Sequence, residues 1–141
     1  MEELVELREL VQKQEYENAL LLIDELEEMS KEDKLSKIYS YIVVLLVHLI
    51  KQIAEQRTTR SWDFSIYNSL KSIKRINERK RSRGVYANEE QLVEIIEDAF
   101  DIALRKSSLE AFGGIYTGDQ LLKKINASEI KHQALNLING D

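Results

Sequence analysis

The chain has 141 residues, the length of one ordinary domain, and 43% of them are hydrophobic, which is enough to form a single core. Its lack of cysteine excludes disulfides and thiolate-bound zinc. A net charge of −5 with 32% charged residues is typical of a soluble protein, and the first residues, MEELVELREL, lack the basic start and apolar middle of a secretory signal. We therefore expect one cytoplasmic domain over residues 1–141.

The spacing of apolar residues predicts an all-α fold. Proline is absent and only five glycines occur, so few positions would interrupt a helix. Apolar residues recur three and four positions apart in almost every segment and never alternate over the length of a strand. We predict a bundle of six to seven helices around one long central helix, at about residues 30–56.

The first helices are predicted from two apolar stripes that are separated by a break near Gln14. Ser30 followed by Asp33 resembles a capping box, so a third helix should begin there and end near Gln56. This helix contains YIVVLLVHLIKQI, residues 41–53, an apolar run broken only by His48, Lys51 and Gln52. Its middle turn is apolar on every side, so the helix should lie at the centre. The run is shorter than the roughly 20 apolar residues that cross a bilayer, so we expect no membrane insertion.

Four more helices are predicted by their caps. Ser61 should begin the fourth, which carries Trp62 on its core face and frays toward Gly84. Capping boxes open the fifth and sixth at Asn88 with Gln91 and at Thr117 with Gln120, and Ser128 should cap the seventh. We expect the seventh to be an appended helix within residues 126–141.

Charge is arranged in blocks. Residues 1–33 carry twelve acids and three bases (−9), residues 34–83 three acids and twelve bases (+9), and residues 84–141 ten acids and five bases (−5). The structural interpretation is that acidic outer helices pair with basic central ones. The functional interpretation is a phosphate-contacting segment between residues 71 and 83, which would make the protein a nucleic-acid-associated factor. Its bases are Lys71, Lys74, Arg75, Arg79, Lys80, Arg81 and Arg83.

His48 lies within the apolar run. One interpretation is a histidine at the core or its edge, hydrogen-bonded to a neighbouring helix. The other is a general base or ligand, oriented by acids of the second helix such as Asp24 and Glu25. No metal or cofactor motif accompanies it. Glu129 and His132 have the Glu-x-x-His spacing of di-iron bundles, but no second copy of the motif precedes His48.

The sequence RTTRSW, residues 57–62, forms the remaining cluster. Structurally, Trp62 would anchor the fourth helix while Arg60 bridges a carboxylate or a helix end, since arginine bonds carboxylates in pairs and stacks on aromatic rings. Alternatively, Arg57 and Arg60 would receive an anionic ligand at the start of that helix. A polar site built from Asp24, Glu25, His48, Arg60 and Trp62 therefore stays open.

Four segments in order resemble one family. They are ENALLLIDELEEMSKEDK at residues 17–34, LLVHLIK at 45–51, TRSWDFSI at 59–66 and YTGDQLL at 116–122. Together they resemble the family catalogued as domain of unknown function 29, whose members occur in cyanobacteria and some proteobacteria. The chain departs from the family pattern at Ser30, where glycine is usual, and before Tyr116, where proline is usual. The resemblance implies an all-helical bacterial protein and supplies no activity.

The sequence contains no recognisable catalytic or cofactor motif, so we expect a protein that is not an enzyme and that needs no cofactor. The role most in keeping with it is a cytoplasmic protein–protein interaction or accessory module. Self-association as a homodimer through an apolar face is the expected form of partnership. The alternatives are the nucleic-acid-associated factor and a small-ligand binder or enzyme around His48, Arg60 and Trp62.

Overall fold

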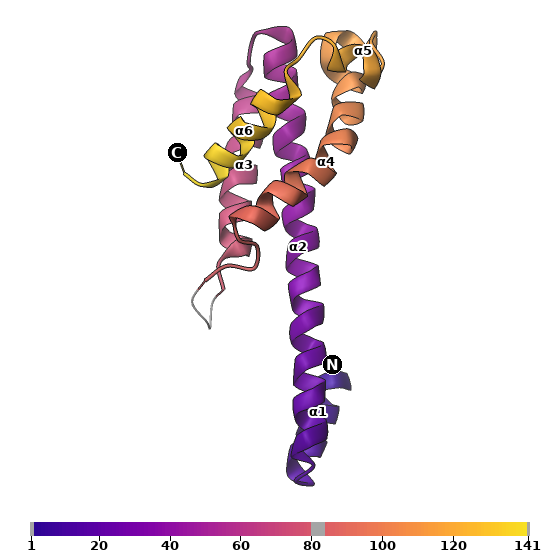
Figure 1. Cartoon of the computed structure of the whole chain (residues 1–141), viewed down its shortest axis with the longest axis vertical. Coiled ribbons are helices and arrows are strands. Elements are labelled where there is room, and N and C mark those ends of the chain that lie inside the picture. The colour runs from indigo at the N-terminus through magenta and orange to yellow at the C-terminus, as the bar shows by residue number, and fades with distance from the viewer. Residues whose placement is uncertain (1, 80–83, 141) are drawn as a thin grey trace. The chain divides into compact units, whose positions relative to one another are not determined.

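The computed structural model describes residues 2–79 and 84–140, and over these ranges it is all-helical, as predicted (Figure 1). An isolated bridge between Glu78 and Val85 is the one piece of β-type pairing in the described residues. The α-helices are α1 (Glu2–Gln12), α2 (Tyr16–Glu55), α3 (Arg60–Asn77), α4 (Glu89–Glu110), α5 (Gly118–Leu122) and α6 (Ala127–Ile138), with a short 3₁₀ helix, η1 (Ala111–Gly114), after α4.

α2 is one continuous helix of 40 residues, so the predicted helix start at Ser30 is wrong. Ser30 lies inside the helix and is exposed. Serine costs a helix interior only about half a kcal/mol relative to alanine, whereas ending the helix would leave backbone groups without partners. No glycine or proline nearby forces an end. The predicted break near Gln14 and the end near Gln56 are confirmed, and both residues have positive φ.

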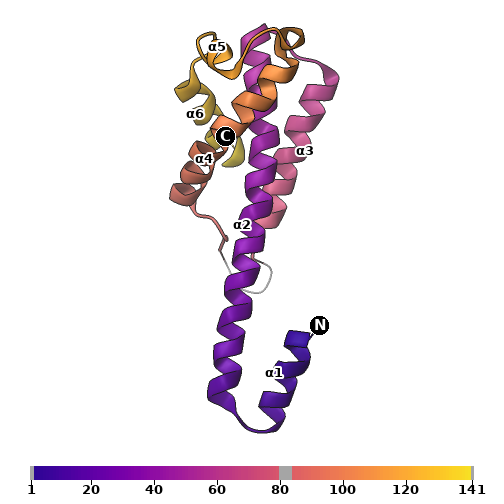
Figure 2. The same cartoon turned by 90° about the vertical axis from the view of Figure 1, so that its right-hand side faces the viewer.

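The chain divides into two compact units, with the division after Lys34 inside α2. The first unit is a helical hairpin formed by α1 and the first part of α2, and we call its described residues, 2–34, the N-terminal hairpin (Figure 2). α1 contains no buried residue. Within the described hairpin, Ala19 is the single buried side chain. The hairpin is therefore thinly packed.

The second unit begins at Leu35 and contains the hydrophobic core. The rest of α2 supplies its centre, because Ile38, Ile42, Leu45, Leu46 and Ile50 are essentially inaccessible to solvent. α3, α4 and α6 add Ile73, Ile96 and Ile130. The predicted central position of the apolar run is confirmed for this unit.

Capping motifs set the starts of the later helices. Asn88 with Gln91 and Thr117 with Gln120 form complete capping boxes, as predicted. The cap of the last helix is Asn126, whose side chain accepts from the Glu129 amide, and not Ser128. α6 contacts α3 and α4 of its own chain, and its Ile130 and Ala134 are buried in the same core.

By length and composition alone, α2 would be able to span a membrane. Half of its most apolar 18-residue window is buried inside the protein. The central helix of a water-soluble bundle can be equally long and equally apolar, because a protein core and a lipid bilayer both favour apolar side chains on all faces of a helix.

Gly114 occupies a position that other residues cannot adopt without strain. Its φ is +79°, and a Cβ placed there would lie 2.7 Å from the carbonyl oxygen of Leu109. We expect Gly114→Ala to lower the free energy of unfolding by about 2–3 kcal/mol, because the contact is with backbone. Gly113 is the matched control, since its φ is +68° with open space around it. Gly113→Ala should cost about 1 kcal/mol in the same urea titration, and equal costs would contradict the steric argument.

Candidate functional site

The turn between α2 and α3 is organised around Trp62. Thr59 caps α3, because its side-chain oxygen accepts a hydrogen bond from the Trp62 amide at 3.1 Å. The indole is 9% exposed, and two cations lie over it: Lys51 Nζ is 4.6 Å and Arg57 Cζ 4.7 Å from the ring centroid. Both distances fit cation–π contacts. We call Lys51, Arg57 and Trp62 the tryptophan junction.

Carboxylates of the same unit neutralise both cations of the junction. Lys51 Nζ lies 2.6 Å from Glu110 Oε2 at the end of α4. Arg57 Nε lies 3.0 Å from Glu55 Oε1, and the other oxygen of Glu55 accepts from the Phe112 amide at 3.3 Å. The junction thus joins α2 and α3 to the end of α4. Because its charges are already paired, it favours the structural interpretation of RTTRSW over an anion site.

A second set of hydrogen bonds closes the turn. Thr58 Oγ1 donates to Asp63 Oδ1 at 2.7 Å, and Gln52 Nε2 donates to Thr58 Oγ1 at 2.7 Å. Asp63 lies in the first turn of α3, as predicted, where a negative charge favours the helix dipole. The turn is therefore fixed by side chains from both helices that it connects.

Two predicted roles at this turn are wrong. Arg60 is exposed, and its side chain makes no hydrogen bond or ion pair among the described residues, so it does not bridge a carboxylate. Arg57 has the role that was predicted for Arg60. It precedes α3, so its side chain can fold back onto the indole of Trp62. The cap is Thr59 and not Ser61. A capping residue bonds the amide two or three positions later, and Thr59 is the one so placed relative to Trp62.

His48 is half-buried, and its ring Nδ1 donates to the backbone carbonyl of Val44 at 2.8 Å. The predicted hydrogen bond to a neighbouring helix is replaced by this one within α2. Asp24 and Glu25 lie on the same helix as His48. They belong to the part of α2 in the first unit, whereas His48 belongs to the second, and both acids are exposed. The prediction that they belong to a helix packed beside His48 fails, because α2 does not break at residue 30.

The basic segment has an aromatic component that sequence reasoning missed. Lys71, Lys74 and Arg75 are exposed on α3, and Arg79 follows it, with its Cζ 5.2 Å from the centroid of Tyr86. Phe64 and Tyr67 on the same helix are 65% and 57% exposed. The available signal was helical spacing, since Lys71 lies four residues after Tyr67 and seven after Phe64. Lys80, Arg81 and Arg83 lie outside the described residues.

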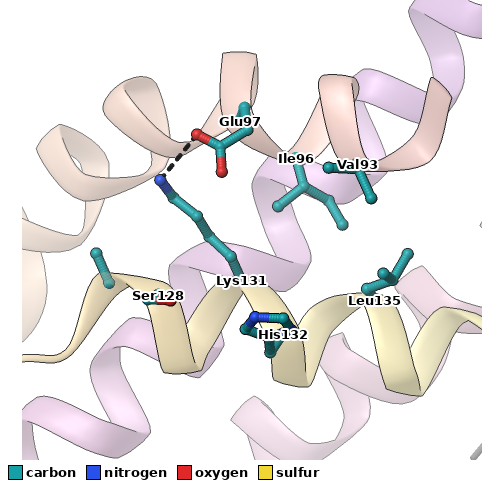
Figure 3. Close-up of a pocket in the computed structure, with 8 residues that line it drawn as sticks. Val93, Ile96, Glu97, Ser128, Lys131, His132 and Leu135 are labelled. Atoms are coloured by element: carbon teal, nitrogen blue, oxygen red, sulfur yellow. Dashed lines mark hydrogen bonds and ion pairs between the residues drawn. The ribbon is translucent and has the colours of Figure 1, made fainter. Parts of the chain in front are cut away.

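A pocket of about 390 Å³ lies between α4 and α6. Its apolar lining includes Val93, Ile96 and Leu135, and its polar residues include His132. Figure 3 shows Lys131 reaching from α6 to Glu97 on α4, with Nζ 3.0 Å from the carboxylate. The volume suits a small molecule. The one ammonium in the lining is already paired, so the pocket offers an apolar surface more than a charged one.

No group of three or more histidine, aspartate or glutamate side chains within residues 2–79 and 84–140 is arranged to hold a metal ion. The described residues thus define a helical-bundle protein with a junction centred on Trp62 and with helices that have one buried and one exposed face. The chain belongs to the family described as Domain of unknown function DUF29, whose model matches residues 5–126. No curated protein and no solved structure matches the chain.

The family match confirms the resemblance that the sequence segments indicated. It includes the tryptophan junction and ends at the residue before α6 begins. Ile130 and Ala134 of α6 nevertheless complete the core. The pocket between α4 and α6 is therefore built partly from residues beyond the matched range.

Proposed function

We propose that this protein is a protein-interaction module that associates with a second copy of itself through the N-terminal hairpin. One observation carries the proposal: large apolar side chains of the hairpin are exposed on both of its helices. Their exposed fractions run from 47% to 62%, and the residues are Leu4, Val5, Val11, Tyr16, Leu20, Leu21 and Met29. The hairpin thus exposes seven large apolar side chains within 33 residues, and such a concentration is typical of association surfaces, whereas single scattered ones are not.

The weak internal packing of the hairpin supports the same conclusion. α1 has 11 residues, none of them buried. Isolated helices of this length are marginal in water, so most of the stability of α1 must come from packing. The hairpin supplies little packing of its own. A protein surface that covers the exposed leucines would provide the missing contacts.

The proposed surface can be removed with two substitutions. In Leu20→Glu/Leu21→Glu, the dissociation constant for self-association should rise by at least about a hundredfold, since two apolar contacts are lost and two charges are added. Both residues are exposed, at 61% and 62%, so the fold of the second unit should persist. Sedimentation equilibrium over a wide concentration range measures the constant, and circular dichroism checks the helix content.

Leu109→Glu is the control, because Leu109 is 77% exposed and lies on α4 in the second unit. It should associate as the wild type does. A wild-type chain that stays monomeric at high micromolar concentration would overturn the proposal. Equal losses in Leu109→Glu and in the hairpin variant would also overturn it, because the effect would then not belong to the hairpin.

A further inference from the structure

We infer that the hairpin of one copy docks on the outward face of α3 of the second copy. The inference rests on the proposed self-association and names the two surfaces that meet. We call the exposed residues 17, 20, 21, 24 and 28 of α2 the acidic face, and the exposed residues 64, 67, 71 and 75 of α3 the basic face.

The acidic face mixes leucine and carboxylate at helical spacing. Leu20 and Leu21 lie between Glu17 and Asp24, and Glu28 follows one turn later. Positions three and four apart share one side of a helix, so these five side chains form a continuous stripe. All five are exposed. Side chains of this kind fit an apolar and cationic counterpart.

The basic face has the complementary composition. Tyr67, Lys71 and Arg75 follow one another at intervals of four, Phe64 lies three residues before Tyr67, and all four are exposed. Lys71 Nζ lies 5.5 Å from the centroid of Tyr67, so the aromatic and cationic groups form one patch. The opposite side of α3 carries the buried Trp62 and Ile73, and Ile73 belongs to the core, whereas Phe64, Tyr67, Lys71 and Arg75 are not among the core residues.

The two faces match in register. Leu20, Asp24 and Glu28 are spaced by four residues, and so are Tyr67, Lys71 and Arg75. A parallel alignment therefore sets Leu20 against Tyr67. The same alignment sets Asp24 against Lys71 and Glu28 against Arg75. Each contact would combine apolar burial with two opposite-charge pairs, and such pairs set specificity and encounter rate more than affinity.

Charge favours this contact over one between two hairpins. Residues 2–34 carry twelve acids and four bases, a net −8, and all twelve acids are exposed. Two hairpins face to face would therefore repel each other. α3 carries four bases and one acid, a net +3. The same argument disfavours a nucleic acid on the basic face, because the hairpin and the total charge of −5 repel a polyanion.

A charge swap tests the inference. Asp24→Lys/Glu28→Lys reverses the acidic face, and Lys71→Glu/Arg75→Glu reverses the basic face. Each variant alone should raise the dissociation constant for self-association at least about tenfold at low salt, because attractive pairs become repulsive ones. An equimolar mixture of the two variants should recover wild-type association, since each reversed face then meets its reversed counterpart. Sedimentation equilibrium measures all three samples.

Lys106→Glu/Lys123→Glu is the matched control, because both lysines are exposed and neither belongs to the basic face. It should associate like the wild type. If Leu20→Glu/Leu21→Glu abolishes association but the mixture does not recover it, self-association stands and the α3 contact is wrong. If no sample associates, the proposed function fails as well. If Lys71→Glu/Arg75→Glu still dimerises but no longer binds a labelled single-stranded RNA that the wild type binds, the face serves nucleic acid and the inference is overturned.

Discussion

Replacing Trp62 with alanine should lower the free energy of unfolding by about 3–5 kcal/mol, the range for removing a large aromatic side chain from a core. The indole is nearly buried and is contacted by Lys51 of α2 and by Arg57 of the turn. Its removal would leave a cavity at the point where α2 and α3 meet. It would also take two cation–π contacts from the junction, each of them worth about 0.5–2 kcal/mol.

Urea denaturation followed by circular dichroism measures this loss, because the variant no longer contains a tryptophan for fluorescence. Phe64→Ala is the matched control: it removes an aromatic side chain from the same helix, but one that is 65% exposed. At concentrations where the chain is monomeric, Phe64→Ala should change the free energy by about 0.5 kcal/mol or less. Similar losses in the two variants would contradict the anchoring role of Trp62.

The tryptophan junction illustrates what the sequence could and could not predict. The cluster RTTRSW was recognised as a helix–helix turn, since tryptophan beside arginine suits that role. Lys51 interrupted the apolar run and had no assigned partner, although it proves to be buried, at 6% exposed, and paired with Glu110. The partners are 59 residues apart in sequence. Local sequence patterns cannot predict this ion pair, because the contact between Lys51 and Glu110 depends on how α4 packs on α2.

Helix positions were largely predictable for a physical reason. Apolar spacing and capping boxes are local signals, and they located α3, α4, α5 and the break near Gln14. The false start at Ser30 came from the same kind of signal. A serine three residues before an acid can cap a helix, but it can also lie inside one at little cost when the flanking residues favour helix. The absence of glycine and proline around Ser30 was the better indicator.

The candidate polar site depended on that false start. Asp24 and Glu25 were expected on a helix beside His48, and the continuous α2 removes the premise. One ring nitrogen of His48 instead makes a hydrogen bond to a backbone carbonyl of its own helix, as polar side chains at the edge of a core often do. The aromatic component of the basic segment was not predicted, because the apolar spacing assigned a core face that contains Trp62 and gave no role to Phe64 and Tyr67.

The end of α3 supplies the second large expected effect. The helix was expected to fray toward Gly84, but it ends at Asn77. Asn77 is buried, its Nδ2 donates to the Ala87 carbonyl at 3.0 Å, and its Oδ1 accepts from the Ala87 amide at 2.7 Å. This pair of bonds fixes the chain just before α4 begins. One side chain therefore satisfies both backbone groups of a residue that is itself 1% exposed.

Asn77→Ala should therefore cost about 2–4 kcal/mol, because it leaves a buried N–H and a buried C=O without partners. Asn77→Asp keeps the acceptor for the Ala87 amide but not the donor, so it should retain part of the stability at neutral pH. Asn68→Ala is the matched control on the same helix, since Asn68 is exposed; alanine should be neutral or slightly stabilising there. Urea denaturation ranks the three variants, and hydrogen exchange at the Ala87 amide should quicken in Asn77→Ala alone. An unchanged exchange rate would show that the amide is protected by something other than Asn77.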